Sequence, residues 1–170
     1  MTGIVIERAR AEDAPAVAAF QTLAWQQTYR GIVDDALLDV PVADRVGRWA
    51  ERIRSGSRVV TVARADGVVV GVASTAIDDR PHAGLPPLEL CTLYLERDVQ
   101  GTGLGARLLH AAIGDEDAHL LVFDVNGGAR RFYERRGFRP ESMALLDAGT
   151  GLTERRWVRR RAAHEGNPGR

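Results

Sequence analysis

The stretch Gln100-Gly101-Thr102-Gly103-Leu104-Gly105-Ala106 has a glycine at every second position from 101 to 105. It follows an apolar run that ends at Leu95 and precedes a helical pattern of leucines, so we predict a turn between a strand and a helix. The amide groups at a helix start are unpaired and carry the positive end of the helix dipole, and glycines let a phosphate approach them. The segment is therefore either an ordinary connection or a pyrophosphate-binding turn.

The spacing disfavours two common nucleotide-binding motifs. A Walker loop requires Gly-Lys-Ser/Thr, and the chain contains no lysine. A dinucleotide fingerprint requires Gly-x-Gly-x-x-Gly after a first strand, whereas the glycines here lie past the middle of the chain at 101, 103 and 105. If the turn binds a pyrophosphate, it therefore does so as neither a Walker loop nor a dinucleotide-binding fingerprint.

The segments around this turn alternate between strand and helix patterns. A strand at 4–8 is followed by a helix from an acidic start at Glu12-Asp13 to about Tyr29, and a second amphipathic helix follows Pro41 and ends near Ser55-Gly56. Asp66-Gly67 predicts a hairpin turn. The other expected elements are strands at 59–65, 68–76, 88–95, 119–125, 143–146 and 152–158, helices at 104–113 and from Ala129 to Gly137, and a loop at 78–87. This order predicts an α/β fold of the α+β layered kind.

The composition predicts one globular domain over residues 1–161. The chain has 170 residues, of which 45% are hydrophobic, and residues 162–170 have no packing pattern, so we expect them to form a disordered tail. No apolar run is long enough to cross a membrane and no secretory signal is visible, which favours the cytoplasm.

Charge and cysteine content exclude several kinds of chemistry. The 23 basic and 23 acidic residues cancel, so nothing favours binding to nucleic acid or to an anionic membrane. All the basic residues are arginines, so a lysine Schiff base is impossible. The single Cys91 forms no internal disulfide, and no metal site is expected.

Two motifs in the expected order resemble the GCN5-related N-acetyltransferase (GNAT) family. Gln100, Gly103 and Gly105 match its signature Gln/Arg-x-x-Gly-x-Gly/Ala, and the segment from Asn126 to Phe138 is similar to its Asn-x-x-Ala-x-x-Phe-Tyr-x-x-x-Gly-Phe pattern. The resemblance covers almost the whole chain except the tail. It implies a mixed, mainly antiparallel sheet flanked by helices, and acetyl-coenzyme A as the acyl donor.

The resemblance also implies which residues contact the donor. Backbone groups of the strand at 88–95 would bind the pantetheine arm as an added strand, the amides of the glycine turn would bind the pyrophosphate, and Asn126 would face the thiol end. The expected cofactor-binding residues are Leu93, Tyr94, Leu95, Gln100, Gly101, Thr102, Gly103, Leu104, Gly105, Asn126, Ala129 and Tyr133. Three features depart from the family pattern, namely Arg97 where many members have proline, Gly127-Gly128 after Asn126, and the charged Asp124.

Two residues are candidates for catalysis. By the resemblance, Tyr133 would stabilise the leaving thiolate, although a core aromatic residue beside Phe132 is the alternative. Glu89, at the start of its strand, would take a proton from the incoming ammonium, although an exposed glutamate at a strand edge would look the same. Amide groups near Leu93 would polarise the carbonyl if that strand is irregular.

The acceptor is the least defined partner. Trp25 and Tyr29 lie one helical turn apart and are candidate walls of the acceptor pocket, with core packing as the alternative for at least one of them. The expected acceptor is a small-molecule or peptide amine, and the closing strands could form a homodimer interface. The leading hypothesis is direct attack of a primary amine on acetyl-coenzyme A in a ternary complex. The alternatives are a non-catalytic acyl-coenzyme A sensing module and an enzyme that uses a different acyl group.

Overall fold

The structure is a computed structural model that describes residues 3–79 and 84–161. The predicted tail at 162–170 and residues 80–83 of the predicted loop lie outside the described residues. The elements in chain order are β1 Ile4–Arg8, the short 3-10 turn Ala11–Asp13, α1 Ala14–Tyr29, α2 Asp35–Leu38, α3 Val42–Ser55, β2 Val59–Ala65, β3 Val68–Ile77, β4 Leu88–Leu95, a 3-10 turn Arg97–Val99, α4 Leu104–Ile113, β5 Ala118–Phe123, α5 Gly127–Glu134, β6 Arg139–Leu146 and β7 Thr153–Arg159.

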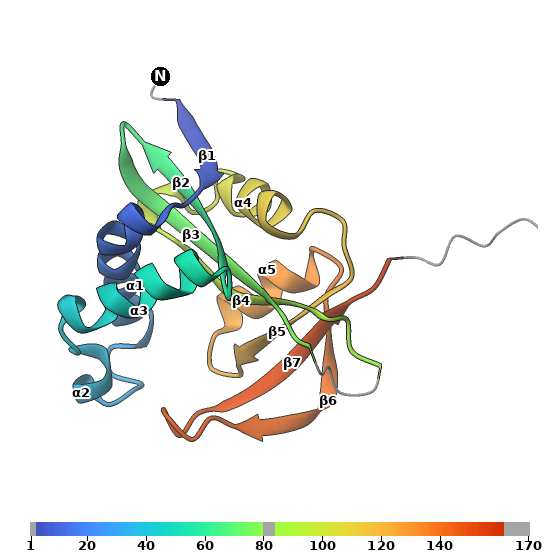
Figure 1. Cartoon of the computed structure of the whole chain (residues 1–170). Coiled ribbons are helices and arrows are strands. Elements are labelled where there is room, and N and C mark those ends of the chain that lie inside the picture. The colour runs from blue at the N-terminus through green and yellow to red at the C-terminus, as the bar shows by residue number, and fades with distance from the viewer. Residues whose placement is uncertain (1–2, 80–83, 162–170) are drawn as a thin grey trace, which may run out of the picture.

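The described strands form one sheet of seven strands in the order β1-β2-β3-β4-β5-β7-β6. Neighbouring strands are antiparallel except for β4 and β5, which are parallel. Figure 1 shows the sheet with helices packed against it. The predicted mixed, mainly antiparallel sheet flanked by helices is confirmed.

The two larger of the three apolar clusters among the described residues lie on opposite faces of the sheet. On one face, residues of α1 and α3 such as Val17 and Trp49 pack against Val60 and Val72 of the first strands. The larger core contains α4 and α5 with strands β2 to β5 and β7, and its Phe138 is fully buried. Because α1 and α3 cover the β1–β3 half, they leave the same face of β5, β7 and β6 less covered (Figure 1).

The predicted hairpin turn is present and has the expected geometry. Asp66 and Gly67 both adopt positive φ, at 50° and 81°, and they join β2 to β3. These values fit a two-residue hairpin turn, for which aspartate followed by glycine is a favoured pair.

The structure corrects several predicted boundaries and adds one helix that was not predicted. The strand predicted at 119–125 ends at Phe123, because residues 124 and 125 form a turn before the α5 cap. The strand predicted from Met143 begins at Arg139 and is interrupted by a register shift between Pro140 and Ala144, which hides its pattern. The last strand is Thr153–Arg159 instead of 152–158. The one-turn helix α2 lies between the first two predicted helices, where no element was predicted, because four residues are too few to show a helical period.

Candidate functional site

A cleft opens where β4 and β5 separate. The two parallel strands share a single pair, Glu89 with His119, and beyond it they diverge. Leu93 and Leu95 pair with β3 on one side and have no described strand partner on the other. The cleft therefore exposes a strand edge on which an extended ligand could add hydrogen bonds.

His119 anchors the closed end of this cleft. It is 5% exposed, and its Nδ1 lies 2.8 Å from the carbonyl oxygen of Pro86 in the segment before β4.

The neighbouring strand β4 carries a bulge, because Ser74 pairs with Thr92 and Thr75 with Leu90, leaving Cys91 without a partner on β3. The strand irregularity on which polarisation by amide groups near Leu93 depends therefore exists at Cys91, two residues before Leu93.

The glycine turn presents unpaired amide groups to the cleft. The backbone amides of residues 101–105 donate no hydrogen bond to a described residue. The next two amides, of Ala106 and Arg107, both donate to the Gly103 carbonyl oxygen. Gly101 and Gly103 have φ of 76° and 89°, in the left-handed region that favours glycine. This arrangement at the start of the ten-residue α4 suits an anion such as a pyrophosphate.

Side chains of the turn brace it from within. The Gln100 side chain donates to the Leu95 carbonyl oxygen at 3.1 Å, and the Thr102 hydroxyl donates to the Val99 carbonyl oxygen at 2.7 Å. Gly105 has a packing role, since a Cβ there would lie 3.0 Å from Leu95 Cδ1 and close to the ring of Phe132. The signature residues Gln100 and Gly105 thus fix the turn against β4 and α5.

The cleft has a volume of about 550 Å³ and is lined by α1, β4, the turn and α5. It contains the predicted donor-binding residues Leu93, Tyr94, Leu95, Gln100, Gly101, Gly103, Gly105, Asn126, Ala129 and Tyr133, whereas Thr102 and Leu104 do not line it. Leu104 is 2% exposed and belongs to the core. Arg97, Arg135 and Arg136 add positive charge along the cleft, so both its shape and its charge fit a long ligand with phosphate groups.

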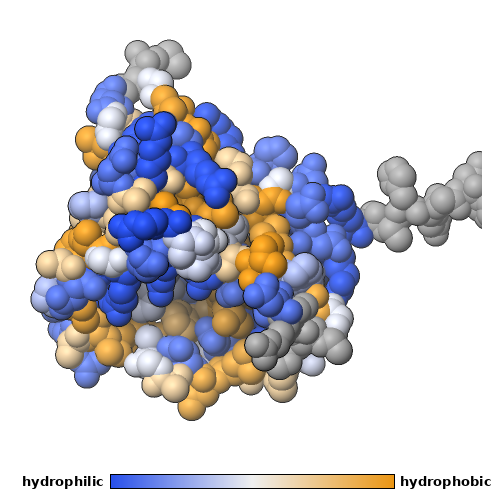
Figure 2. All heavy atoms as spheres, viewed as in Figure 1, coloured by the Kyte–Doolittle hydropathy of each residue, from blue (hydrophilic) through white to orange (hydrophobic). Residues whose placement is uncertain are grey.

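A second pocket of about 280 Å³ adjoins the cleft. Both are lined by the residues Leu93, Tyr94, Asn126, Ala129 and Tyr133, which form the junction between them. The second pocket, called the acceptor pocket below, contains the candidate residues Trp25, Tyr29 and Glu89. Figure 2 shows a hollow on the viewed face of the molecule, with apolar and polar groups side by side around it.

Tyr133 lies at the junction of the two cavities. It is 7% exposed, its ring contacts those of Phe132 and Phe138, and no described residue hydrogen-bonds its hydroxyl. Burial raises the pKa of the hydroxyl well above its usual value, and the nearby Tyr29 raises it further. The phenol therefore stays protonated at neutral pH and can donate a hydrogen bond to a group placed at the junction.

Asn126 holds the other side of the junction. Its side-chain oxygen accepts a hydrogen bond from the Ala129 amide at 3.0 Å and thereby caps α5. Its side-chain nitrogen donates to the Tyr29 hydroxyl at 3.2 Å, so one residue joins the start of α5 to the end of α1.

Three aromatic rings form a wall of the acceptor pocket. Tyr29 lies 5.2 Å from Trp25 and 5.5 Å from Phe123 between ring centroids, with edge or tilted geometry. Trp25 and Tyr29 were expected from their helical spacing, and both line the pocket, although Tyr29 is also buried at 4% exposure. Phe123 was missed because an aromatic residue near a strand end carries no signal for a pocket.

Three carboxylates from different parts of the chain line the same pocket. Glu89 comes from β4, Glu154 from β7, and Asp147 from the turn between β6 and β7. Only Glu89 was anticipated, because the β6–β7 hairpin that brings the other two carboxylates to the pocket has no recognisable motif. The acceptor pocket is therefore acidic as well as aromatic.

The environments of two of these carboxylates differ. The hydroxyl and the amide of Thr150 donate to Asp147 at 2.6 and 2.8 Å and hold the pKa of that carboxyl below its usual range. Burial raises the pKa of Glu154, and the neighbouring Asp147 and Glu89 raise it further, while Arg156 lowers it. Asp147 is thus a fixed anion, and Glu154 is the carboxylate that accepts a proton more readily.

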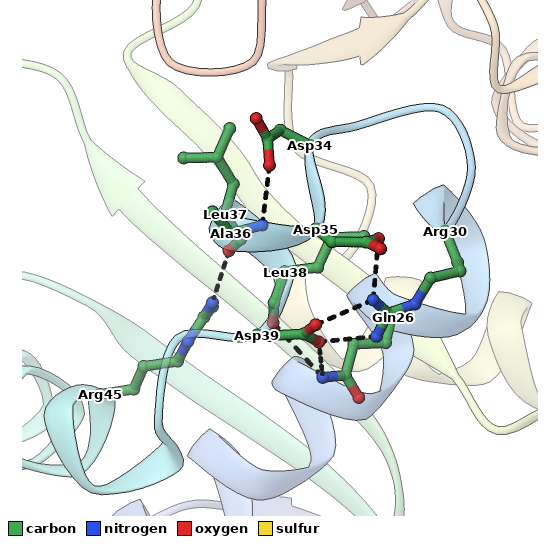
Figure 3. Close-up of polar contacts among 9 residues, drawn as sticks. All are labelled: Gln26, Arg30, Asp34, Asp35, Ala36, Leu37, Leu38, Asp39 and Arg45. Atoms are coloured by element: carbon green, nitrogen blue, oxygen red, sulfur yellow. Dashed lines mark hydrogen bonds and ion pairs between the residues drawn. The ribbon is translucent and has the colours of Figure 1, made fainter.

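An ion-pair network positions the α1 end of the pocket. Arg30, directly after Tyr29, pairs with Asp35 at 2.8 Å and with Asp39 at 2.6 Å, and Gln26 also donates to Asp39 (Figure 3). These contacts raise the pKa of Arg30 and lower that of Asp39. They fasten α2 to the carboxyl-terminal end of α1, whose last two turns carry Trp25 and Tyr29.

The departures from the family pattern have local partners. Asp124 pairs with Arg155 at 3.1 Å, so its charge is not isolated. Arg97 donates to the Gln27 carbonyl oxygen at 2.8 Å and ties the segment after β4 to α1. Gly128 lines the cleft, and a Cβ there would meet only the Asn126 side-chain oxygen, at 3.7 Å.

Cys91 also lines the acceptor pocket, and its thiol donates to the Glu89 carbonyl oxygen. Burial raises its pKa to about 12, and the negative charge of Glu89 contributes. Since the thiolate is the reactive form, Cys91 is poorly suited to act as a nucleophile near neutral pH.

Within residues 3–79 and 84–161, no cluster of His, Cys, Asp and Glu side chains could hold a metal ion. No helix of the described chain is both long enough and apolar enough to span a membrane.

Comparisons with known proteins agree with this geometry. Residues 24–157 match the model of the acetyltransferase (GNAT) domain. A probable N-acetyltransferase of Mycobacterium tuberculosis, Rv2775, is 29% identical over 81% of this chain and 80% of its own length. The solved PaiA N-acetyltransferase of Thermoplasma acidophilum in complex with coenzyme A has a TM-score of 0.68 at 22% identity, covering 89% of this chain and 98% of its own. YncA of Salmonella typhimurium, a putative acetyltransferase solved with acetyl-CoA, has a TM-score of 0.67 at 23% identity, covering 97% of this chain and 99% of its own.

Proposed function

The chain belongs to the GNAT acetyltransferase family and is an acetyl-coenzyme A-dependent acetyltransferase, and from that premise we propose that it acetylates a primary amine bound in the acceptor pocket. The observation that carries the proposal is the junction, where Tyr133 and Asn126 line both cavities. An amine in one cavity and a thioester in the other would meet beside the buried Tyr133 hydroxyl. A non-catalytic sensing module would not need this second, connected pocket.

The donor would lie along the cleft. The free edge of Leu93 and Leu95 would pair with its amide-bearing arm, the amides from Gly101 to Gly105 would bind its pyrophosphate, and the arginines of the cleft would face its other phosphate. When bound, the donor supplies the acetyl group as a thioester.

Glu89 in the acceptor pocket and Tyr133 at the junction have different tasks in the proposed transfer. Glu89, directly or through water, accepts a proton from the ammonium, and the neutral nitrogen then attacks the carbonyl carbon. As the N–C bond forms and the C–S bond breaks, the Tyr133 hydroxyl donates a hydrogen bond to the departing sulfur. A Glu89→Gln variant with the wild-type kcat would exclude the proton-acceptor role of Glu89.

The donor site is tested by calorimetric titration of the protein with acetyl-CoA, with Ala106→Glu as the variant. Ala106 lines the cleft in the first turn of α4, where a glutamate suits the helix but repels a pyrophosphate. We expect affinity to fall at least about tenfold. Ala111→Glu on the exposed side of the same helix is the matched control. Equal affinity of both variants and the wild type would place the donor elsewhere. Gly105 is unsuitable for this test, since a side chain there would disturb β4 and α5.

A further inference from the structure

We propose that the acceptor is an aliphatic amine with a second positive charge, which Asp147 and Glu154 bind in the part of the acceptor pocket that is not shared with the donor cleft. This inference rests on the proposed acetyl transfer and specifies its substrate class. It arises from the charge, the walls and the connection of the acceptor pocket taken together.

The pocket has an excess of negative charge. Glu89, Asp147 and Glu154 line it, and no arginine does so among the described residues. Arg156, the cation on the same strand as Glu154, lies 3.7 Å from Glu141 and does not line the pocket. A single ammonium would leave at least one carboxylate of the trio without a counter-charge, so the pocket favours a ligand with more than one cation.

The junction and the carboxylates of the pocket have different chemistry. The transfer takes place at the junction, marked by the Tyr133 hydroxyl, which is buried and has no described hydrogen-bond partner. Asp147 and Glu154, like Glu89, line the acceptor pocket but not the donor cleft, so none of the three carboxylates belongs to the junction itself. Glu89 is the carboxylate assigned to the reacting nitrogen, which leaves Asp147 and Glu154 to bind a second cation.

The shape and the remaining wall fit an alkyl chain between two nitrogens. The rings of Trp25, Tyr29 and Phe123 give an apolar surface that also attracts cations. A volume of about 280 Å³ has room for about nine groups the size of water. The Asp147 carboxylate is already fixed by Thr150, so it needs no reordering to bind an ammonium.

The experiment compares three primary amines of equal chain length by acetyl-CoA-dependent thiol release. The acceptors are 1,5-diaminopentane, pentylamine and 5-aminopentanoate, which differ in the charge of the remote group. We expect kcat/KM for the diamine to exceed that for pentylamine at least about tenfold, equivalent to about 1.4 kcal/mol, and 5-aminopentanoate to be the poorest. Asp147→Asn and Glu154→Gln should each reduce the ratio of diamine to pentylamine at least about threefold, mainly through KM. Glu12→Gln, an exposed carboxylate outside the pocket, should leave the ratio unchanged.

Equal kcat/KM for the diamine and pentylamine would overturn the inference while acetyl transfer stands. A preference for the diamine that neither variant reduces would overturn the assignment to Asp147 and Glu154. If no amine is acetylated, the proposed function fails, and calorimetric titration with 1,5-diaminopentane still decides the inference. Binding about tenfold weaker in the Asp147→Asn, Glu154→Gln double variant would support it, and equal binding would overturn it.

Discussion

The side-chain amide of Asn126 donates a hydrogen bond to the Tyr29 hydroxyl at 3.2 Å, which joins two residues 97 positions apart in the sequence. Asn126 also caps α5 through the Ala129 amide. The donor cleft and the acceptor pocket are therefore fixed to each other by one side chain, whose two functional groups bind different helices.

Replacing Asn126 by alanine should weaken both connections. Loss of an N-cap costs about 0.5–2 kcal/mol, and the Tyr29 hydroxyl, in a residue only 4% exposed, loses its donor. We expect the free energy of unfolding to fall by about 1–3 kcal/mol in urea denaturation. Tyr29→Phe keeps the cap and should cost only about 1 kcal/mol. Equal losses in the two variants would mean that the cap contributes nothing.

Replacing Tyr133 by phenylalanine should slow catalysis without preventing donor binding. The ring remains to pack against Phe132 and Phe138, but the hydroxyl at the junction is lost. We expect kcat for amine acetylation to fall about 10- to 100-fold, since a positioned acid contributes at least that much. Affinity for acetyl-CoA, measured by calorimetry, should change less than about threefold.

Tyr94 is the alternative candidate for stabilising the leaving thiolate, because it also lines both cavities and burial raises the pKa of its hydroxyl. Tyr94→Phe is therefore the comparison variant. If Tyr94→Phe loses more kcat than Tyr133→Phe, the leaving group is stabilised by Tyr94 and not by Tyr133.

The geometry of the glycine turn and of the α5 start is the part of the candidate site that the sequence predicts best. The glycine turn needs positive φ at Gly101 and Gly103, and the α5 start needs a capping side chain at Asn126, so local backbone geometry leaves a readable pattern. Most residues expected to bind the donor line one cleft. Leu104 is an exception, because it belongs to the leucine pattern that forms the apolar face of α4 and is buried in the core.

The acceptor side depends on contacts between segments distant in sequence, which no local pattern records. Asp147 and Glu154 reach the pocket only because β7 pairs with β5, placing Glu154 beside Phe123. The β6–β7 hairpin carries a register shift, so even its strand boundaries were difficult to predict. The ion pair between Asp124 and Arg155 also joins segments that are distant in sequence. The sequence therefore shows the charge of Asp124 as a departure from the family pattern but does not show its partner.

Cys91 should be dispensable for catalysis. With a pKa of about 12, its thiol is protonated near neutral pH and cannot readily take up an acetyl group. We expect Cys91→Ala to retain kcat within about threefold, and mass spectrometry of the wild type after incubation with acetyl-CoA to show no acetylated Cys91. An acetyl-enzyme that forms and decays at the rate of turnover would replace direct attack by a two-step transfer.

Glu154 should lower the stability of the protein in the pH range where it is ionised. Its carboxyl is hydrogen-bonded to no described side chain, it faces Asp147 and Glu89 across the pocket, and Arg156 on its own strand is the nearby cation. The elements packed around it otherwise present Phe123 of β5, Leu145 of β6 and the rings of α1. Because its folded-state pKa is raised, the folded protein binds this proton more tightly than the unfolded chain does.

The sign of the pH effect follows from that difference. Below the ordinary glutamate pKa of about 4.3, Glu154 is protonated in both the folded and the unfolded chain, and its full contribution to the free energy of unfolding is present. That contribution is lost as the pH rises through the higher folded-state pKa. Glu154→Gln should therefore have a higher Tm than the wild type at pH 7 and the same Tm near pH 4. We expect a gain below about 1 kcal/mol, because the carboxyl is partly exposed and water screens its neighbours.

Thermal melts of the wild type and of Glu154→Gln across this pH range would test the prediction, with Glu12→Gln as the exposed control. A difference in Tm that is independent of pH would show that packing of the amide is responsible. A Glu154→Gln variant less stable than the wild type at pH 7 would show that the carboxylate is stabilised by a cation, and the pocket would then not carry the uncompensated negative charge from which the dicationic acceptor is inferred.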